Sequence, residues 1–454
     1  MKRTQIYLLA FLAIGSPVPV VAQDITVVTG ATVIGGAGST PIADAVVIIE
    51  GARFGRIGPR ATTAVPSNAV VIDARGKFVI PGLADMHNHV RSGSFRLQQA
   101  FTTNLSLLLA FGVTTVLNPS SSKTDFAGLK TATAADTAPY PRFFGTGPMI
   151  TVKGDTLGAA DGGLSPETPA EVQAAIEDLK AAGVDAIKIN RDDLRWAVKQ
   201  RLPLMNADIL AALVKQAHQE GLKVFVHAPI LAQAKEALRA GADALMHGII
   251  DEPVDQEFID LMKRNQAAYV PTLSLYEDVA DVAAWAKRQA TYDKAGLLSV
   301  ISNGFATGRG GQQFTSIFDN SSFTKSRLST QRANLKKVFD AGVPVVMGTD
   351  SGFFGVLMGL SSQLELALMV EAGLTPEAAL RAATINAARM IGRGDVVGSI
   401  EPGRLADMIV LDGNPLIDIG NIRRIHRVIR GGVVHDPSQL LAGVRIVPAP
   451  SQGR

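Results

Sequence analysis

Six side chains that can bind a metal ion or take part in proton transfer are spread along this 454-residue chain, each at or near the end of a short apolar run. They are those of His87, His89, Lys188, His227, His247 and Asp350. Imidazole nitrogens and carboxylate oxygens are common ligands of divalent ions, and a bound ion can activate water at neutral pH. The residues therefore predict a metal-dependent hydrolytic site, on condition that the fold brings them together.

The four histidines form two pairs. Because His87 and His89 are two residues apart, both imidazoles point to the same face of an ideal strand and can bind one ion. A His-X-His pair alone is a weak signal, and His227 or His247 alone is as well explained by a hydrogen-bonded core histidine. The pairs become informative because each follows a predicted strand at a matching position.

Lys188 lies between Ile187 and Ile189 on a predicted buried strand, where an unpaired ammonium group is unfavourable. One interpretation is a salt bridge to Asp185 or Asp192. The other is that CO₂ has added to Lys188, so that the resulting carbamate bridges two metal ions.

Asp350 ends the apolar run that begins at Val343. A carboxylate there can bind a metal ion and also accept a proton from water, which are the two tasks of a hydrolytic base. It can instead cap the following helix, and the two roles are compatible.

The apolar runs predict eight parallel strands that alternate with amphipathic helices, which is the pattern of an α/β protein with a (β/α)₈ TIM barrel. The predicted strands are residues 78–89, 113–118, 142–147, 185–190, 223–228, 243–248, 267–273 and 343–350. Helical patterns cover residues 169–183, 206–221, 231–241, 324–342 and 375–392. The C-terminal ends of barrel strands meet at one mouth, so the six residues would converge there.

Both chain ends carry short runs of Val and Ile separated by Gly-rich turns, a pattern that predicts small sheets. We expect these segments to pair into one small β-sandwich domain. The predicted division is a signal peptide at residues 1–22, a first part of the sandwich at 23–80, the hydrolase barrel at 81–395 and a second part of the sandwich at 396–454.

The first 22 residues have two basic residues, an apolar stretch and small residues ahead of Gln23, as in a secretory signal peptide. This predicts a periplasmic or secreted protein. The apolar stretch from Ile6 to Ile14 is shorter than the roughly 20 residues of a membrane span, although an uncleaved anchor is the alternative.

Charge and cysteine content exclude several classes of function. Loss of Lys2 and Arg3 with the leader lowers the formal net charge from +3 to +1, which leaves no basic footprint for nucleic acid or membrane. The chain has no Cys, and therefore no disulfides and no thiolate ligands. We expect a small-molecule or short-peptide substrate, and a homo-oligomer is compatible with the composition.

Six motifs together resemble the amidohydrolase superfamily, especially its secreted prolidase-like and imidazolonepropionase-like branch. They are PGLADMHNH, GVDAIKI, VFVHA, ALMHG, VMGTDSG and GSIEPGRLADMIVLDGNPL. The resemblance implies a binuclear site, with His87, His89 and Asp350 on one ion and His227 and His247 on the other. Lys188, as a carbamate, would bridge the two ions.

The resemblance also implies a mechanism in which a metal-bridging hydroxide attacks a C–N bond and Asp350 acts as general base and then acid. Nitrogen and oxygen ligands suit two Zn²⁺ ions, and Mn²⁺, Co²⁺ and Fe²⁺ are alternatives. We expect an amide, peptide or cyclic amide substrate. An esterase, lactonase or phosphotriesterase on the same site, a mononuclear deaminase or imidazolone hydrolase, and a non-catalytic metal- or ligand-binding protein are the competing hypotheses.

The loops depart from the dipeptide-cleaving relatives. Those relatives carry an Arg-Asp pair after the second strand, where this chain has Leu117 and Asn118, and an aromatic residue where it has Pro229. The usual His after the third strand is also missing. A less charged amide, a lactam or an ester therefore has at least equal standing with a dipeptide as the expected substrate. Candidate substrate-binding residues are Asn118, Lys153, Asp155, Asn190, Tyr276 and Ser351.

Overall fold

The computed structural model describes residues 25–90, 101–291 and 325–442, apart from 37, 39, 156, 159, 160, 198–200, 353 and 354. The predicted signal peptide at residues 1–22 lies outside the described residues. Within these ranges, no helix combines the length and the apolar character that a membrane crossing requires.

Eight extended segments make up the barrel wall that the sequence predicted. Its strands are β6 (Leu83–Asp85), β7 (Val113–Asn118), β8 (Arg142–Gly145), β9 (Ala186–Asn190), β10 (Lys223–His227), β11 (Ala244–Met246), β12 (Ala268–Val270) and the extended segment 343–350. Two parallel sheets, β6-β7-β8 and β9-β10-β11-β12, make up most of the wall.

Backbone hydrogen bonds join the two sheets into a ring. Ile150 N donates to Lys188 O at 2.8 Å, which links the chain after β8 to β9. Tyr269 N donates to Pro344 O at 2.8 Å, and Asp350 N donates to His87 O at 2.7 Å, so the eighth segment closes the wall between β12 and the chain after β6. The (β/α)₈ prediction is therefore confirmed.

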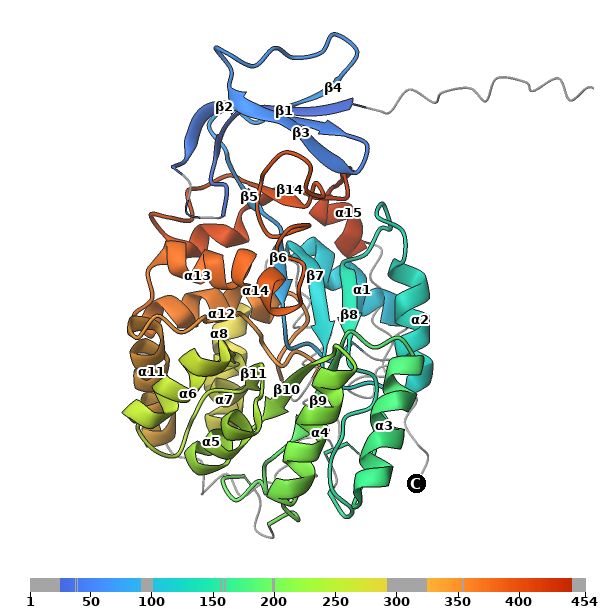
Figure 1. Cartoon of the computed structure of the whole chain (residues 1–454). Helices are drawn as coiled ribbons and strands as arrows, with labels where there is room; N and C mark the ends of the chain where they lie inside the picture. The colour runs from blue at the N-terminus through green and yellow to red at the C-terminus, as the bar shows by residue number, and fades with distance from the viewer. Residues whose placement is uncertain are drawn as a thin grey trace, which may run out of the picture.

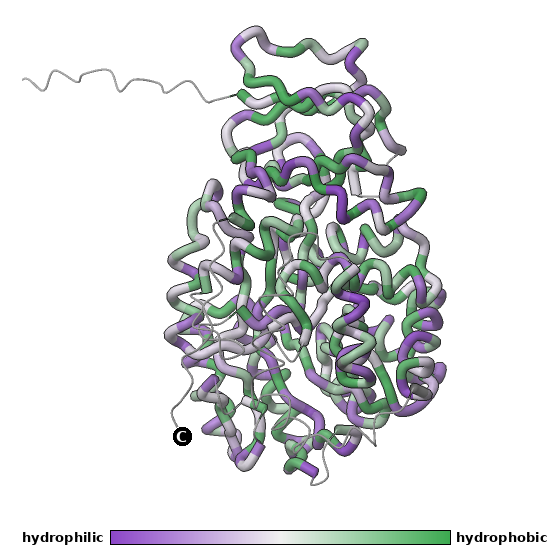
Figure 2. The backbone as a smooth tube through the Cα atoms, turned by 180° about the vertical axis from the view of Figure 1, so that it is seen from behind, coloured by the Kyte–Doolittle hydropathy of each residue, from purple (hydrophilic) through white to green (hydrophobic). Residues whose placement is uncertain are grey.

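Helices surround the barrel wall. They are α1 (Phe101–Ala110), α2 (Lys123–Thr133), α3 (Pro169–Ala181), α4 (Ala207–Gln219), α5 (Leu231–Ala240), α6 (Gln256–Asn265), α7 (Leu273–Ala280), α8 (Val282–Ala290), α11 (Lys325–Asp340), α12 (Leu360–Glu371), α13 (Pro376–Ala382) and α14 (Ile385–Met390). Helix α3 shows how local sequence sets an end, because Thr168 and Glu171 form a reciprocal capping box and Pro169 occupies the first turn. Figure 2 shows hydrophobic stretches along the central strands and hydrophilic ones on the helices outside them.

The pattern at residues 375–392 predicted one helical segment, and the structure divides it into α13 and α14. The helix breaks because backbone N–H groups of the barrel wall form hydrogen bonds with carbonyl groups of this segment. Ala84 N donates to Ala383 O at 2.7 Å, and Met347 N donates to Ala382 O at 3.0 Å. An uninterrupted helix would use these carbonyls internally, so the break serves the first and eighth strands.

The two chain ends form one mixed eight-stranded sheet. Its order is β15-β14-β13-β5-β1-β2-β3, with β4 also paired to β1. The strands are β1 (Ile25–Val33), β2 (Ile42–Glu50), β3 (Arg53–Pro59), β4 (Val70–Asp73), β5 (Phe78–Pro81), β13 (Met408–Leu411), β14 (Ile425–Arg430) and β15 (Val433–His435), accompanied by a 3₁₀ helix, η3 (Ile419–Arg423), and α15 (Pro437–Ala442). The antiparallel pair of β5 with β13 joins the N-terminal and C-terminal segments.

The terminal sheet adjoins the N-terminal end of the barrel, because β5 leads directly into β6. At the junction the Arg142 guanidinium contacts two carboxylates, with Nε 2.8 Å from Asp407 Oδ2 and Nη1 2.6 Å from Asp136 Oδ1. The C-terminal ends of the barrel strands point away from this sheet (Figure 1). A site at the strand ends therefore lies at the opposite end of the barrel.

Candidate metal centre

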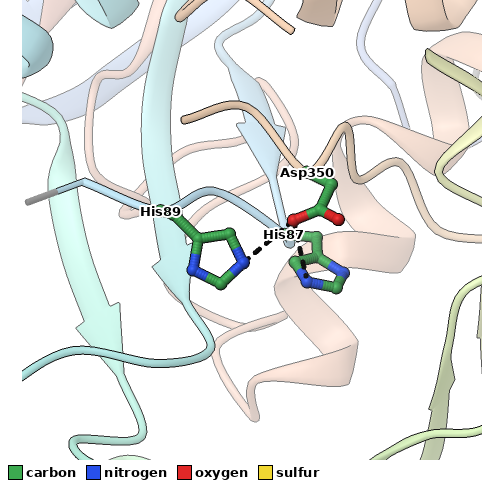
Figure 3. A group of neighbouring side chains, drawn as sticks. All are labelled: His87, His89 and Asp350. Atoms are coloured by element: carbon green, nitrogen blue, oxygen red, sulfur yellow. Dashed lines mark ion pairs between the residues drawn. The ribbon is translucent and has the colours of Figure 1, made fainter. Parts of the chain in front are cut away.

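Two imidazoles and a carboxylate meet where the first and eighth barrel segments end (Figure 3). Candidate ligand atoms of His87, His89 and Asp350 all lie within 4.8 Å of one another. Oδ1 of Asp350 is 2.9 Å from Nε2 of His89 and 3.4 Å from Nε2 of His87. One divalent ion could be bound by all three side chains without a change of fold.

The backbone around this group is closely packed. A Cβ atom added to Gly348 would lie 2.8 Å from the Cβ of His87 and 2.5 Å from Val270, so only glycine permits this approach of the two segments. Asp350 itself has a left-handed φ of 64°, and His247 has one of 85°. Such conformations are costly for these residue types and are concentrated here at the strand ends.

The second histidine pair lies next to the first. The ring centroids of His227 and His247 are 4.2 Å apart, and those of His87 and His247 are 4.6 Å apart. Lys188 is buried on β9, which pairs in parallel with β10, the strand that ends at His227. Its charge contributes to lowering the pKa of both His87 and His247. The structure thus brings the four histidines and Asp350 together, with Lys188 buried on a neighbouring strand.

Burial controls the protonation of the site. It lowers the pKa of Lys188 to about 7, with the nearby Asp350 carboxylate opposing the shift. It also places the pKa of His87 and of His247 well below the usual value, and the positive charge of Lys188 adds to that effect. Neutral imidazole is the form that binds metal, and a neutral amine is the form that adds CO₂.

The two carboxylates that could have formed a salt bridge with Lys188 have other partners. Asp185 Oδ2 accepts from Lys130 Nζ at 2.6 Å, and Asp192 Oδ2 lies 3.1 Å from His227 Nε2. Asp192 Oδ2 also accepts from the indole of Trp196 at 2.8 Å. These contacts favour a role for Lys188 other than pairing with those carboxylates.

Polar partners fix the rings of the second pair. Asp192 engages Nε2 of His227, and the hydroxyl of Thr272 lies 2.8 Å from Nδ1 of His247. The opposite nitrogen of each ring, Nδ1 of His227 and Nε2 of His247, is then the one that can bind an ion. The sequence suggested Asp192 only as a partner of Lys188 and did not suggest Thr272, because neither adjoins its histidine in the chain.

Asp85 is a functional residue for which sequence reasoning offered no role. Its side chain is fully buried, and Oδ1 accepts from the backbone nitrogens of His87 at 3.2 Å and Thr349 at 3.1 Å. Oδ2 accepts from Asn88 Nδ2 at 3.1 Å, Thr349 Oγ1 at 2.7 Å and Ser362 Oγ at 2.9 Å. Asp85 therefore joins the segment that carries His87 to the one that carries Asp350. The sequence feature that could have pointed to Asp85 is its position two residues before His87, on the same predicted strand.

Two predicted substrate-binding residues support the backbone. Asn118 Nδ2 donates to Val90 O at 2.6 Å, and its Oδ1 accepts from Ser120 N at 3.2 Å. Ser351 Oγ lies 2.6 Å from Thr349 Oγ1 and donates to Leu357 O at 3.2 Å. Both side chains are fully buried.

The other four candidates have different surroundings. Asn190 Nδ2 donates to Asp155 Oδ2 at 2.5 Å, so these two buried residues contact each other. Lys153 is exposed. Tyr276 is buried with its ring edge-on to His247, at a centroid distance of 6.0 Å, so it contacts a histidine of the site.

The donor set suits divalent ions bound by nitrogen and oxygen. Oδ1 of Asp350 approaches Nε2 of both His87 and His89, so these three atoms can face one ion. Nδ1 of His87 is also buried and has no hydrogen-bond partner within the described part of the chain, which is unusual for a buried polar atom. The residues present therefore fit a bound divalent ion.

Comparisons with known proteins identify the family of this chain. Residues 78–435 match the amidohydrolase family. An imidazolonepropionase of Geobacillus kaustophilus is 37% identical over 115 residues, which are 24% of this chain and 26% of that protein. The match thus spans about a quarter of the length of this curated relative.

Two solved structures share the architecture over nearly their whole length. A Xaa-Pro dipeptidase with bound methionine is 26% identical with a TM-score of 0.74, covering 91% of this chain and 100% of that one. A putative prolidase from Bifidobacterium longum is 25% identical with a TM-score of 0.75, covering 93% and 99%. The chain belongs to the amidohydrolase family, which confirms the resemblance seen in its motifs.

Proposed function

We propose that this protein is a binuclear metal-dependent hydrolase that cleaves a C–N bond in an amide, peptide or cyclic amide. The convergence of His87, His89, Lys188, His227, His247 and Asp350 on one buried site is the observation that carries the proposal. Two divalent ions, with Zn²⁺ as the first choice, would be held by the four imidazoles, by Asp350 and by Lys188 as a carbamate.

The names of the relatives support this reaction class. Imidazolonepropionase and Xaa-Pro dipeptidase are the activities named for a sequence relative and a structural neighbour. We therefore propose a small-molecule or short-peptide substrate. The departures at Leu117, Asn118 and Pro229 favour a substrate less charged than a dipeptide.

Each protein group has a distinct task in the proposed mechanism. Divalent ions, when held by these residues, would supply an activated water and polarise the scissile carbonyl. Asp350 takes a proton from the attacking water and returns it to the leaving amine, which requires its Oδ1 to face the reacting atoms. Asp85, Asp192 and Thr272 hold the ligating segments and rings in place, and so reduce the reorganisation needed during the reaction.

Metal analysis combined with a substrate panel tests the proposal. The purified chain should contain two ions, and chelation should abolish hydrolysis of N-acyl amino acids, dipeptides or lactams, with recovery on adding Zn²⁺. We expect Asp350→Asn to lower kcat at least about 100-fold, as loss of a general base does, and Lys188→Ala to release metal.

Matched surface variants control for the substitutions themselves. Asp395→Asn and Lys263→Ala change exposed residues of the same types and should leave metal content and kcat unchanged. Activity confined to esters or lactones would replace the amide proposal with the esterase alternative. Full activity in Lys188→Ala would contradict the carbamate.

We also propose that the protein acts in the periplasm or outside the cell, because residues 1–22 have the pattern of a signal peptide. Mass spectrometry of the exported protein checks this, with a mature chain beginning at Gln23 as the expected result.

A further inference from the structure

Helix α12 carries two polar side chains one turn apart that are both fully buried, Ser362 and Glu365. A buried carboxyl group in a helix interior is costly unless it has strong partners. The partners of Ser362 and Glu365 lie on two different sides of the candidate metal centre.

Ser362 connects α12 to the first half of the site. Its hydroxyl donates to Asp85 Oδ2 at 2.9 Å. Asp85 in turn accepts hydrogen bonds from the backbone nitrogen of His87, a candidate ligand, and from that of Thr349, which precedes Asp350. The orientation of the first ligand group therefore depends on a carboxylate that α12 helps to hold.

Glu365 connects α12 to the second half. Its Oε1 accepts from Leu273 N at 2.7 Å, and its Oε2 accepts from Ser274 N at 2.7 Å and from Ser274 Oγ at 2.7 Å. These residues begin α7, directly after Thr272. Thr272 has a left-handed φ of 47° and no side-chain bond to the helix, because its hydroxyl lies against Nδ1 of His247.

Glu365 thus takes over the capping role that Thr272 does not perform. A helix whose N-cap side chain faces elsewhere leaves its first N–H groups to other acceptors. Here the acceptor comes from α12, and Thr272 remains committed to the histidine.

We propose that α12 is a positioning element of the metal centre, in which Ser362 orients the His87 side through Asp85 and Glu365 orients His247 through Thr272. This inference rests on the proposed binuclear function in one respect, which is the assumption that the His87 side and the His247 side each bind a metal ion. Neither Ser362 nor Glu365 is a catalytic residue.

The chemistry of Glu365 suggests a nearly isosteric test. Burial raises its pKa to about 8, while the three donors oppose the shift. In either protonation state each carboxyl oxygen keeps a lone pair for one backbone N–H. The amide nitrogen of Gln has no such lone pair, so Glu365→Gln sets a donor against the N–H of Leu273 or of Ser274.

The experiment measures stepwise metal affinities of the metal-free chain by competition with a chromogenic chelator, using Zn²⁺ as the probe. We expect Glu365→Gln to lower the affinity for one of the two ions by about 10- to 100-fold, which is the usual effect of losing a hydrogen-bond partner of a metal ligand. Ser362→Ala should lower the affinity for the other ion by a similar factor. In a His247→Ala background, which removes one half of the site, Glu365→Gln should lose its effect while Ser362→Ala keeps it.

Gln363→Ala is the matched control. Gln363 is buried on the same helix, but its amide donates to Phe111 O and Ile422 O instead of the site. Its substitution should lower thermal stability and leave both affinities unchanged. If Glu365→Gln, Ser362→Ala and Gln363→Ala all lowered the affinity for both ions equally, α12 would act only through general packing. That result would overturn the proposal.

A metal-independent measurement separates this inference from the proposed function. The ring ¹⁵N resonances of His247 in the metal-free protein should move in Glu365→Gln and stay in place in Gln363→Ala. Resonances that do not move in Glu365→Gln overturn the positioning role, whatever metal binds. A wild-type chain that binds fewer than two ions refutes the binuclear proposal instead.

Discussion

At the scale of single residues, the candidate ligands are only part of the site. Asp85 accepts five hydrogen bonds, from backbone and side chains on both of the segments that carry the first ligand group. Burial raises its pKa, while these donors act in the opposite direction. A carboxyl group surrounded by donors on both oxygens has no good replacement among the other residue types.

Asp85→Asn should therefore impair the enzyme although Asp85 touches no substrate. The new amide nitrogen would face either the backbone donors at Oδ1 or the donors at Oδ2, and one hydrogen bond would become a repulsive contact. We expect metal affinity to fall about 10- to 100-fold. Chelator competition and kcat at saturating Zn²⁺ measure the effect. Wild-type values in both assays would mean that the network around Asp85 does not position His87.

The sequence pointed to the candidate ligands but not to their hydrogen-bond partners, for a physical reason. His87, His89 and Asp350 follow apolar runs, so local pattern places them at strand ends. The partners Thr272 and Asp192 depend on which loops face each other, which is set only by the closed barrel. Asn118 and Ser351 also stood at strand ends and instead support the backbone.

At the scale of elements, α7 is held at both ends by buried carboxyl groups. Glu365 caps its beginning, and Asp278 near its end accepts from Gly355 N at 3.0 Å in the segment that follows Asp350. Burial raises the pKa of Asp278 from its usual value of 3.8 to about 7, with the Gly355 hydrogen bond opposing the shift. The protonated form is therefore the one that the fold favours.

This shift predicts a pH dependence of stability. Because the folded-state pKa of Asp278 exceeds its unfolded value, its contribution is fully present below about pH 4 and is lost as pH rises through about 7. Three pKa units correspond to about 4 kcal/mol in the free energy of unfolding. Asp278→Asn, which cannot ionise, should be more stable relative to wild type at pH 8 than at pH 5.

Urea unfolding of the metal-free proteins at several pH values measures this difference. Asp340→Asn, at an exposed position near the end of α11, is the control and should show no comparable pH dependence. If the free energy of unfolding of the wild type and of Asp278→Asn changed in parallel from pH 4 to 8, the raised pKa of Asp278 would be contradicted.

Helices could be predicted from the sequence where local sequence patterns determine their ends. The helical patterns at residues 169–183 and 231–241 match α3 and α5, which a capping box at Thr168 and a left-handed Gly241 bound in the structure. The break between α13 and α14 was not predicted, because its cause is the need of Ala84 N and Met347 N for carbonyl partners across the barrel. No pattern within residues 375–392 contains that information.

At the scale of the whole molecule, the candidate metal centre and the joining of the chain ends lie at opposite ends of one barrel (Figure 1). Eight apolar runs that alternate with helical patterns predicted the barrel, and similar β-rich ends predicted that the termini would meet. The pairing of β5 with β13 meets that expectation. The buried charges of the junction were not predicted, since Arg142 and Asp407 lie 265 positions apart.

The junction provides a test of whether the two ends of the barrel act independently. Arg142 and Asp407 are both buried, and their side chains form two hydrogen bonds, of 2.8 and 3.1 Å. Arg142→Met should leave the Asp407 carboxylate without its cation and lower the free energy of unfolding by about 3 kcal/mol. Arg142→Met combined with Asp407→Leu should recover part of the loss, because the uncompensated charge is gone.

Arg264→Met, at an exposed position of α6, controls for the loss of a guanidinium group. The measurements are urea unfolding and, on the folded protein, kcat and metal content. Since the candidate metal centre lies at the far end of the barrel, kcat and metal content should match wild type in every junction variant while stability falls. A parallel drop in metal content would mean that strain at the junction reaches the ligands through the barrel strands, and that the terminal sheet helps to shape the site.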